Sequence, residues 1–332
     1  MKKALSVILA LVLCLSCFAA CGKTDANTDG TGDAANTAKK YKIGICQLVE
    51  HVALDAATEG FKQAIIDELG ADAVAFDVQN GQNDPNICST IANQFVSNKV
   101  DLIMANATPA LQAAAAATGE IPILGTSVTE YGVALEIKDF NGTVGGNISG
   151  TSDLAPLDKQ AEMITAWCPN AKTVGLLYCS KEANSQYQVD VVKAELEKKN
   201  ITVKMYPFTD SNDLAQICTT AADNCDAIYV PTDNTVAENT GIIDNICEPK
   251  KIPVIAGEEG ICSGCGIATL SISYYDLGYT TGKMAVKILK GEAKIAEMPI
   301  EYADKQTPKY NKQNCEALDI APLDGYTAIE AK

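Results

Sequence analysis

The chain has 332 residues, with 42 Asp and Glu against 26 Lys, no Arg and a single His, and its net charge is −16. We expect no nucleic-acid partner, because phosphate binding needs a basic surface. A lone His excludes the metalloprotease motif with two His residues on one helix. The absence of Arg excludes bidentate guanidinium binding of a carboxylate.

The first twenty residues have the pattern of a secretory signal. Lys2 and Lys3 precede an apolar run over residues 4–20 that ends in small residues. A transmembrane anchor is the alternative, but the run is short for a bilayer span of roughly 20 residues. "FAAC" at 18–21 resembles the lipobox of bacterial lipoproteins, whose Cys becomes the lipid-modified N-terminus. The resemblance implies an extracytoplasmic protein anchored to the cell membrane through Cys21.

Residues 21–40 contain no large apolar residue and are rich in Gly, Asn, Asp and Thr. Such a segment cannot bury enough surface to offset its ordering entropy, and we interpret it as a flexible tether. The folded body then starts near Tyr41. Its length of about 290 residues is typical of two domains or two lobes.

From Tyr41 onward, short apolar runs alternate with helical patterns, as in a doubly wound parallel sheet. The strands expected in the first half are 41–48, 73–80, 100–106 and 121–128, and the helices are 54–69, 84–98 and 109–118. The second half repeats this order, with strands at 172–179, 201–208, 225–231 and 252–258 and helices at 182–200, 210–224 and 235–248. The repetition indicates a duplicated unit.

Small residues at 147–156 suit a hinge, and a second crossing is expected before a helix that starts at Asp276. We therefore predict two similar doubly wound parallel-sheet lobes joined by a multi-crossing hinge, a clamshell whose lobes can rotate. Lobe 1 is expected to comprise residues 41–150 and 273–300, and lobe 2 residues 151–272 and 301–332.

Ligands of open α/β sheets bind beyond the carboxyl ends of the strands, near helix N-termini. In the first half, Asn106, Thr108, Pro109 and Ala110 stand at such a corner, and the next strand ends in Thr126, Ser127 and Thr129. Hydroxyl, amide and backbone N–H groups of this kind suit a small anion. Capping of the helices alone is the alternative role.

The corresponding ends in the second half are acidic, with Asp233 after one strand and Glu258 after the next, and Asp153 lies in the hinge. Carboxylates suit an ammonium group, so the two halves together predict a zwitterion, that is, an amino acid. His51 and Glu50 follow the first strand and point to the same cleft, and Tyr274 is expected to wall it. The full set of predicted ligand-binding residues is Gln47, Glu50, His51, Asn106, Thr108, Pro109, Ala110, Thr126, Ser127, Thr129, Ser152, Asp153, Asp233, Asn234, Glu258 and Tyr274.

The ten Cys of the body mostly lie within apolar runs, which favours small buried side chains over disulfides. "CSGC" at 262–265 lacks a second pair of zinc ligands, so we expect a local disulfide or an inert turn there. "GYTTGKM" at 278–284 misses the P-loop spacing and is interpreted as a helix with small residues on one face. No catalytic residue, metal or cofactor is predicted.

Together, "IGICQLVEHVALD", "VDLIMANATPALQAA", "IPILGTSVTE", "GTSDLAP", "DAIYVPTDNTV" and "SISYYDLGYTTGKMAVKILKGEAK" resemble the substrate-binding lipoproteins of ABC importers of the tryptophan/tyrosine-binding type. The resemblance covers about residues 41–310. It implies a type I periplasmic-binding-protein fold and capture of an amino acid, often aromatic, for a membrane permease. We expect the protein to be a monomer. It places the ligand carboxylate near 108–110 and 126–129, and the amine near Asp153 and 233–234. Val52 stands where the family usually has Pro, and "CSGC" has no usual counterpart.

Two alternatives remain open at this point. The same architecture binds sugars or nucleosides in other proteins, but their clefts favour stacked aromatic rings. An extracytoplasmic enzyme would need a nucleophile, a base or a metal, and the sequence offers one His without an accompanying motif.

Overall fold

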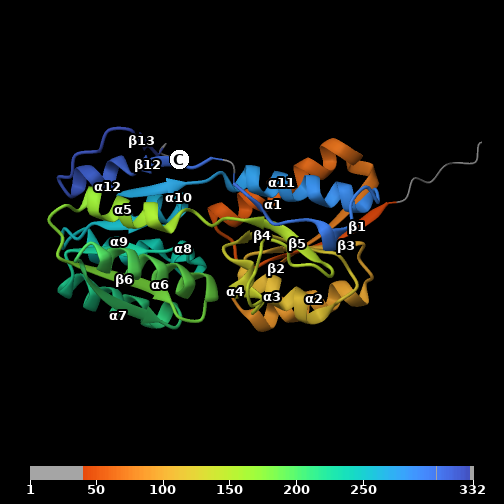
Figure 1. Ribbon diagram of the computed structural model, residues 1–332, viewed down its shortest axis with the longest axis horizontal. Coiled ribbons are helices and arrows are strands. Elements are labelled where there is room, and N and C mark those ends of the chain that lie inside the picture. Colours follow the sequence, from red (N-terminus) through yellow and green to blue (C-terminus); the bar gives the residue numbers. More distant parts are fainter. Residues whose placement is uncertain (1–39, 304, 330–332) are drawn as a thin grey trace, which may run out of the picture. The chain divides into compact units, whose positions relative to one another are not determined.

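The structure is a computed structural model that describes residues 40–303 and 305–329. The expected signal peptide, Cys21 and the tether up to residue 39 lie outside these residues. The described part contains two β-sheets, each with its own helices (Figure 1). We call the first sheet with its helices lobe 1 and the second sheet with its helices lobe 2.

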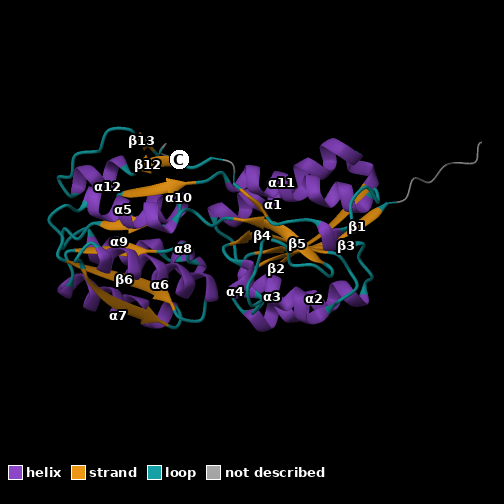
Figure 2. Ribbon diagram, viewed as in Figure 1, coloured by secondary structure: helices purple, strands orange, loops and turns teal. Residues whose placement is uncertain are grey.

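Lobe 1 is built on a six-stranded sheet in the order β11-β5-β4-β3-β1-β2, in which every pair is parallel. Its strands are β1 (Tyr41–Gln47), β2 (Val74–Asn80), β3 (Leu102–Asn106), β4 (Ile123–Val128), β5 (Ile148–Ser152) and β11 (Glu301–Tyr302). Its helices are α1 (Val52–Leu69), α2 (Pro85–Ser97), α3 (Thr108–Ala117), α4 (Tyr131–Ala134) and α11 (Tyr274–Leu289), with short 3₁₀ turns at Ala71–Ala73 and Ile295–Glu297. Helices α1 and α11 cover one face of the sheet, and α2 and α3 cover the other (Figure 2).

Lobe 2 is built on a seven-stranded sheet in the order β13-β12-β10-β9-β8-β6-β7, with one antiparallel pair, β10–β12. Its strands are β6 (Thr173–Cys179), β7 (Thr202–Phe208), β8 (Ala227–Val230), β9 (Val254–Ala256), β10 (Ala268–Ser271), β12 (Thr307–Tyr310) and β13 (Thr327–Ala328). Its helices are α5 (Leu157–Trp167), α6 (Ala183–Lys198), α7 (Ser211–Asn224), α8 (Asn234–Glu238), α9 (Thr240–Cys247), α10 (Glu259–Cys265) and α12 (Lys312–Ala317). The α/β class and the two similar lobes are as predicted.

Local signals explain where several helices begin. Asp84 caps α2 by accepting from the Asn86 amide, and Pro85 is the first helical residue. Asp210 caps α7 with a full capping box that includes Asp213. The buried face of α1 carries Leu54, Phe61 and Ile65, which recur at helical spacing.

The chain passes between the lobes three times, after β5, after β10 and after β11. β5 continues to Ser152 and β11 pairs with it at Glu301 and Tyr302, so lobe 1 extends two residues past the boundaries expected at 150 and 300. The helix expected over 235–248 is divided into α8 and α9 at Asn239. The "CSGC" motif is not a turn, because Cys262 and Cys265 lie in α10 as buried free thiols.

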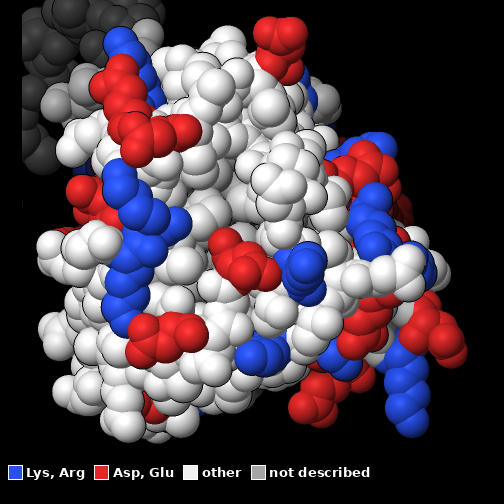
Figure 3. Space-filling model, turned by 90° about the vertical axis from the view of Figure 1, so that its left-hand side faces the viewer, with Lys and Arg blue, Asp and Glu red and all other residues white. Residues whose placement is uncertain are grey.

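The face in Figure 3 carries acidic and Lys side chains side by side rather than a patch of one sign. Several Lys side chains among the described residues pair with an acid on the same helix, such as Lys159 with Glu162 and Lys198 with Glu195. Pairs of this kind contribute little to stability. In the described part of the chain, no helix combines the length and apolar character that a bilayer crossing needs.

Candidate functional site

The carboxyl ends of the strands of both lobes meet around a small cavity. It is lined by His51, Leu54, Ser127, Thr129, Asp153, Asn184, Thr232, Asp233, Asn234, Ala237, Glu258 and Tyr274. Its volume is about 10 Å³, which corresponds to about one water molecule. The lobes are therefore closed on one another in this structure, and a larger molecule enters only when they separate.

Half of the sixteen predicted residues line this cavity. They are His51, Ser127, Thr129, Asp153, Asp233, Asn234, Glu258 and Tyr274. The other eight are Gln47, Glu50, Asn106, Thr108, Pro109, Ala110, Thr126 and Ser152, and they lie outside it. The first corner of the sequence, 106–110, thus does not share a cavity with 232–234, whereas the end of β4 does.

Gln47 and Asn106 lie beneath the first turns of α1. The Gln47 amide donates to Asp55 Oδ1 over 2.6 Å and to the Val49 carbonyl over 2.9 Å. The Asn106 amide donates to the Leu54 carbonyl over 2.8 Å and to Thr58 Oγ1 over 3.0 Å. These two residues hold the start of α1, and with it His51, in place.

The remaining predicted residues outside the cavity have different surroundings. Thr126 Oγ1 lies 3.2 Å from Thr151 Oγ1 inside lobe 1. Ser152 Oγ donates to the Thr129 carbonyl over 2.7 Å and so fixes the first crossing. Thr108, Pro109 and Ala110 are buried in the first turn of α3, whereas Glu50 is exposed.

Three polar atoms in the cavity residues are buried and have no hydrogen-bond partner, namely Ser127 Oγ, Asp153 Oδ1 and Asn184 Oδ1. Buried polar atoms are almost always paired, so three such atoms around one cavity indicate a site for a polar ligand. Ser127 also has a φ of 54°, in the left-handed region that non-glycine residues rarely adopt. Strain of this type is concentrated at binding sites.

Asp233 and Glu258 both cap short helices, which the sequence analysis did not anticipate. Asp233 accepts from the Val236 amide over 2.9 Å and from the Cys179 amide over 2.7 Å. Glu258 accepts from the Gly260 amide over 2.6 Å and from the Ile261 amide. Among the three acids of the cavity, only Asp153 retains an oxygen that accepts nothing, since its Oδ2 accepts from the Tyr274 hydroxyl over 2.9 Å.

Burial makes these carboxyls harder to ionise. It raises the pKa of Glu258 to about 7, and burial together with the neighbouring Glu182 raises the pKa of Asp233 to about 8. Burial also raises the pKa of Asp153, against the effect of hydrogen bonds from Tyr274 and Thr129. No Lys is among the residues that line the cavity. A cationic group in the cavity would therefore stabilise the ionised acids.

Leu54, Asn184, Thr232 and Ala237 line the cavity and were missed by the sequence analysis. Glu182 was missed as well. It is 4% exposed and accepts from the Asn234 amide over 3.0 Å and from the Thr235 amide over 2.9 Å, so it orders the start of α8. The signal was present in the duplication, because Glu182 and the start of α6, which carries Asn184, correspond to the β1–α1 connection that carries His51.

Contacts across the cleft join the same elements. His51 Nε2 lies 3.4 Å from Asn234 Oδ1, and the Asn83 amide donates to Thr235 Oγ1 over 3.2 Å. Burial lowers the pKa of His51. Both partners in lobe 2 are hydrogen-bonded to Glu182, which therefore holds the lobe 2 side of the closed cleft.

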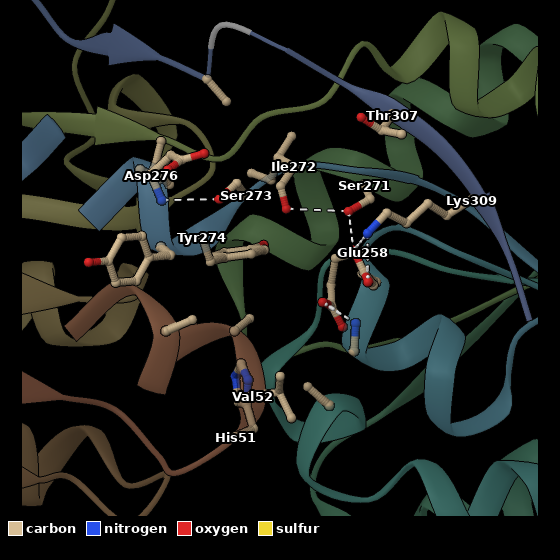
Figure 4. A pocket seen from close by; sticks show the side chains of 18 of the residues that line it. His51, Val52, Glu258, Ser271, Ile272, Ser273, Tyr274, Asp276, Thr307 and Lys309 are labelled. Atoms are coloured by element: carbon tan, nitrogen blue, oxygen red, sulfur yellow. Dashed lines mark hydrogen bonds and ion pairs between the residues drawn. The ribbon is translucent and has the colours of Figure 1, made fainter. Parts of the chain in front are cut away.

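A larger groove of about 1540 Å³ lies beside the cavity (Figure 4). It is bounded by the start of α1, the crossing after β10 and the strand β12, on which Lys309 pairs with Glu259 over 2.7 Å. His51, Ala237, Glu258 and Tyr274 line both spaces, so they lie between the groove and the cavity. Among the described residues, no cluster of three or more His, Cys, Asp and Glu is arranged to hold a metal ion.

Comparison with known proteins extends these observations. Residues 42–325 match the family described as ABC transporter substrate binding protein. The tyrosine-binding protein of Clostridioides difficile (strain R20291) is 38% identical over 325 residues, which covers 97% of this chain and 94% of that protein.

Two solved structures are similar over most of the chain. The ABC domain of Streptococcus pneumoniae in complex with L-Trp is 34% identical, with a TM-score of 0.82 over 87% of this chain and 100% of that chain. A substrate-binding protein with adhesive properties from Clostridium difficile, in a ligand-free, open structure, is 39% identical, with a TM-score of 0.67 over 88% of this chain and 100% of that chain. The open structure has the higher sequence identity of the two but the lower TM-score. This difference agrees with the closed cleft of the present structure. The fold is that of type I periplasmic binding proteins, and the chain belongs to the ABC transporter substrate-binding protein family.

Proposed function

We propose that this protein binds an aromatic L-amino acid between its two lobes and delivers it, unchanged, to an ABC permease. The relative named for tyrosine and the structure that holds L-Trp support the aromatic class. The observation that carries the proposal is Asp153 Oδ1, a buried carboxylate oxygen in the cavity that accepts no hydrogen bond. An ammonium group provides the charged donor that this oxygen lacks.

The other end of the amino acid has partners in lobe 1. Ser127 Oγ is unpartnered, and Thr129 lies beside it at the end of β4. Because the Thr129 hydroxyl is engaged with Asp153, we assign the ligand carboxylate to Ser127 and the ammonium group to Asp153. Asp233 and Asn234 of lobe 2 line the same cavity, so an amino acid bound to the lobe 1 groups also meets lobe 2 when the lobes close on it.

Isothermal titration with a panel of L-amino acids, and with glucose and adenosine as representatives of other ligand classes, tests the proposal. We expect at least one aromatic amino acid to bind, and Asp153→Asn to weaken that binding by tenfold or more. Asp158→Asn is the matched control, because Asp158 is exposed in the first turn of α5. Binding of glucose or adenosine with no response to any aromatic amino acid would contradict the proposal.

We further propose that the mature protein is a monomer that starts at a lipid-modified Cys21 and lies outside the cytoplasmic membrane. The family assignment and the signal pattern support this location. Intact mass measurement of the protein extracted from its membrane tests the anchor. An N-terminus at Met1 would contradict it.

A further inference from the structure

The amide of Asn184 has a fixed orientation. Its nitrogen donates to Glu182 Oε2 over 3.1 Å, to the Thr232 carbonyl over 3.1 Å and to Ser185 Oγ over 3.3 Å. Reversing the amide would place its oxygen against a carboxylate and a carbonyl, which repel it. The carbonyl oxygen of Asn184 is therefore held away from these groups, on a residue that lines the cavity and is 5% exposed.

This oxygen is a buried acceptor that has no donor in the protein. Asn184 Oδ1 accepts no hydrogen bond, and the nearby oxygens of Glu182 and Thr232 are acceptors too. A hydrocarbon surface packed against the oxygen would leave it buried and unpaired, which is costly. A ligand that carries an O–H or N–H group at this point would satisfy it.

Asn184 lies at the opposite end of the cavity from the proposed ammonium site. Glu258 follows β9, and Asn184 follows β6, with β8 between them. Neighbouring strands are about 4.8 Å apart, so the ends of β9 and β6, from which the chain leads to these two residues, are separated by roughly 10 Å along the cleft. Tyr274 and Asp153 belong to the Glu258 end, at the crossings. An amino acid held there by its ammonium group directs a long side chain toward Asn184.

We infer that Asn184 Oδ1 accepts a hydrogen bond from the polar tip of the ligand's aromatic ring, so that the protein selects tyrosine or tryptophan over phenylalanine. This inference rests on the proposed function and adds to it which part of the ligand the protein recognises, namely the polar tip of the ring. Tyrosine offers a phenolic O–H and tryptophan an indole N–H, whereas phenylalanine offers no donor. The discrimination arises because phenylalanine leaves the buried oxygen unpaired.

Titration of the full folded protein with tyrosine, phenylalanine and para-fluoro-phenylalanine tests the inference. The fluorinated ligand fills much of the space of the phenol without offering a donor. We expect tyrosine to bind at least about tenfold more tightly than either analogue. In Asn184→Ala and Asn184→Ser, both of which lack the carbonyl, this ratio should fall to within about threefold.

Ser127→Ala is the matched control, because it acts at the carboxylate that all three ligands share. It should weaken the binding of tyrosine and of phenylalanine by the same factor and leave the ratio of their affinities unchanged. A melting curve for each variant checks that it is folded. If both Asn184 variants fail to fold, the comparison of the three ligands on the unmodified protein still tests the inference.

The outcomes separate the inference from the proposed function. If no aromatic amino acid binds, the proposed function fails and the inference fails with it. If tyrosine and phenylalanine bind the unmodified protein equally, only the inference is overturned. It is also overturned if folded Asn184 variants keep the full preference for tyrosine, because the discrimination then arises elsewhere.

Discussion

The hydroxyl of Tyr274 donates to Asp153 Oδ2 over 2.9 Å and thereby joins two of the three crossings between the lobes. Asp153 directly follows β5, and Tyr274 is the first residue of α11. Because Oδ2 is occupied by the phenol, Oδ1 is the oxygen that remains for a ligand. The phenol therefore positions the carboxylate as well as linking the crossings.

Tyr274→Phe removes this hydrogen bond while it keeps the ring that lines the cavity. We expect affinity for the amino acid to fall about tenfold, since a hydrogen bond to a charged group contributes roughly 1.5–3 kcal/mol. Titration calorimetry measures the change. Tyr275→Phe is the control, because the neighbouring Tyr275 is 42% exposed and does not line the cavity. Equal losses in both variants would contradict the positioning role.

Much of this architecture was predictable from the sequence, because the alternation of apolar runs and helical faces is a property of local spacing. The ends of β4, β8 and β9 were correctly located, and Ser127, Asp233 and Glu258 do line one cavity. Duplication made the second half predictable from the first. The same logic applied to the start of α6 would have found Asn184.

The roles of single side chains were less predictable. Asn106 resembles a ligand-binding residue by position, yet its amide is committed to the Leu54 carbonyl and Thr58. Asp233 looks like a free acid, yet both of its oxygens accept backbone amides. Strand ends supply ligand contacts and helix caps with the same residue types, so the sequence alone does not separate the two uses.

The buried acids should determine how the stability of the protein depends on pH. Burial raises the pKa of Glu258 to about 7 and that of Asp233 to about 8, whereas unfolded carboxyls titrate near pH 4. Between about pH 4 and pH 8 the folded protein thus binds more protons than the unfolded chain, and the free energy of unfolding falls as pH rises. We expect the ligand-free melting temperature to decrease across this window.

Asp233→Asn should make this decrease less steep, because it removes the carboxyl with the higher pKa of the two. Ser273→Ala is the control for loss of a cap without loss of a titrating group, since Ser273 Oγ caps α11 through the Asp276 amide. It should lower the melting temperature by a similar amount at every pH. A melting temperature that rises toward pH 8 in the unmodified protein would show that other groups dominate.

The cysteines should be unreactive in the folded protein. Nine of the ten described cysteines are buried and Cys168 is half-buried, all as free thiols. Burial raises the pKa of Cys168 to about 12 and that of Cys315 to about 11, so these two carry little thiolate at neutral pH, whereas a hydrogen bond with Cys46 lowers the pKa of the buried Cys88 thiol. We expect slow reaction with a disulfide reagent at pH 8 and reaction of all ten after denaturation. The sulfurs of Cys218 and Cys247 lie 3.8 Å apart. If these two cysteines do not react with the reagent after denaturation, they form a disulfide.

The packing of α1 against α11 should tolerate no added methyl group. A Cβ at Gly278 would lie 1.9 Å from the Ala57 carbonyl oxygen, and a Cβ at Gly60 would lie 2.0 Å from the Tyr275 carbonyl oxygen. Backbone atoms cannot move aside as a flexible side chain can, so each substitution forces the helices apart. We expect Gly278→Ala to lower the free energy of unfolding by about 1–3 kcal/mol or more.

This separation should also reach the binding site, because His51 precedes α1 and Tyr274 begins α11. A Gly278→Ala variant that still folds is therefore expected to lose ligand affinity, although residue 278 lines neither the cavity nor the groove. Gly119→Ala is the control, because a Cβ there meets no atom within 4 Å. Chemical denaturation and titration of the two variants separate the effects. If Gly278→Ala has the stability of the unmodified protein, the two helices are not packed as closely as described. If Gly278→Ala is destabilised but binds the ligand with normal affinity, the spacing of the helices does not set the position of Tyr274.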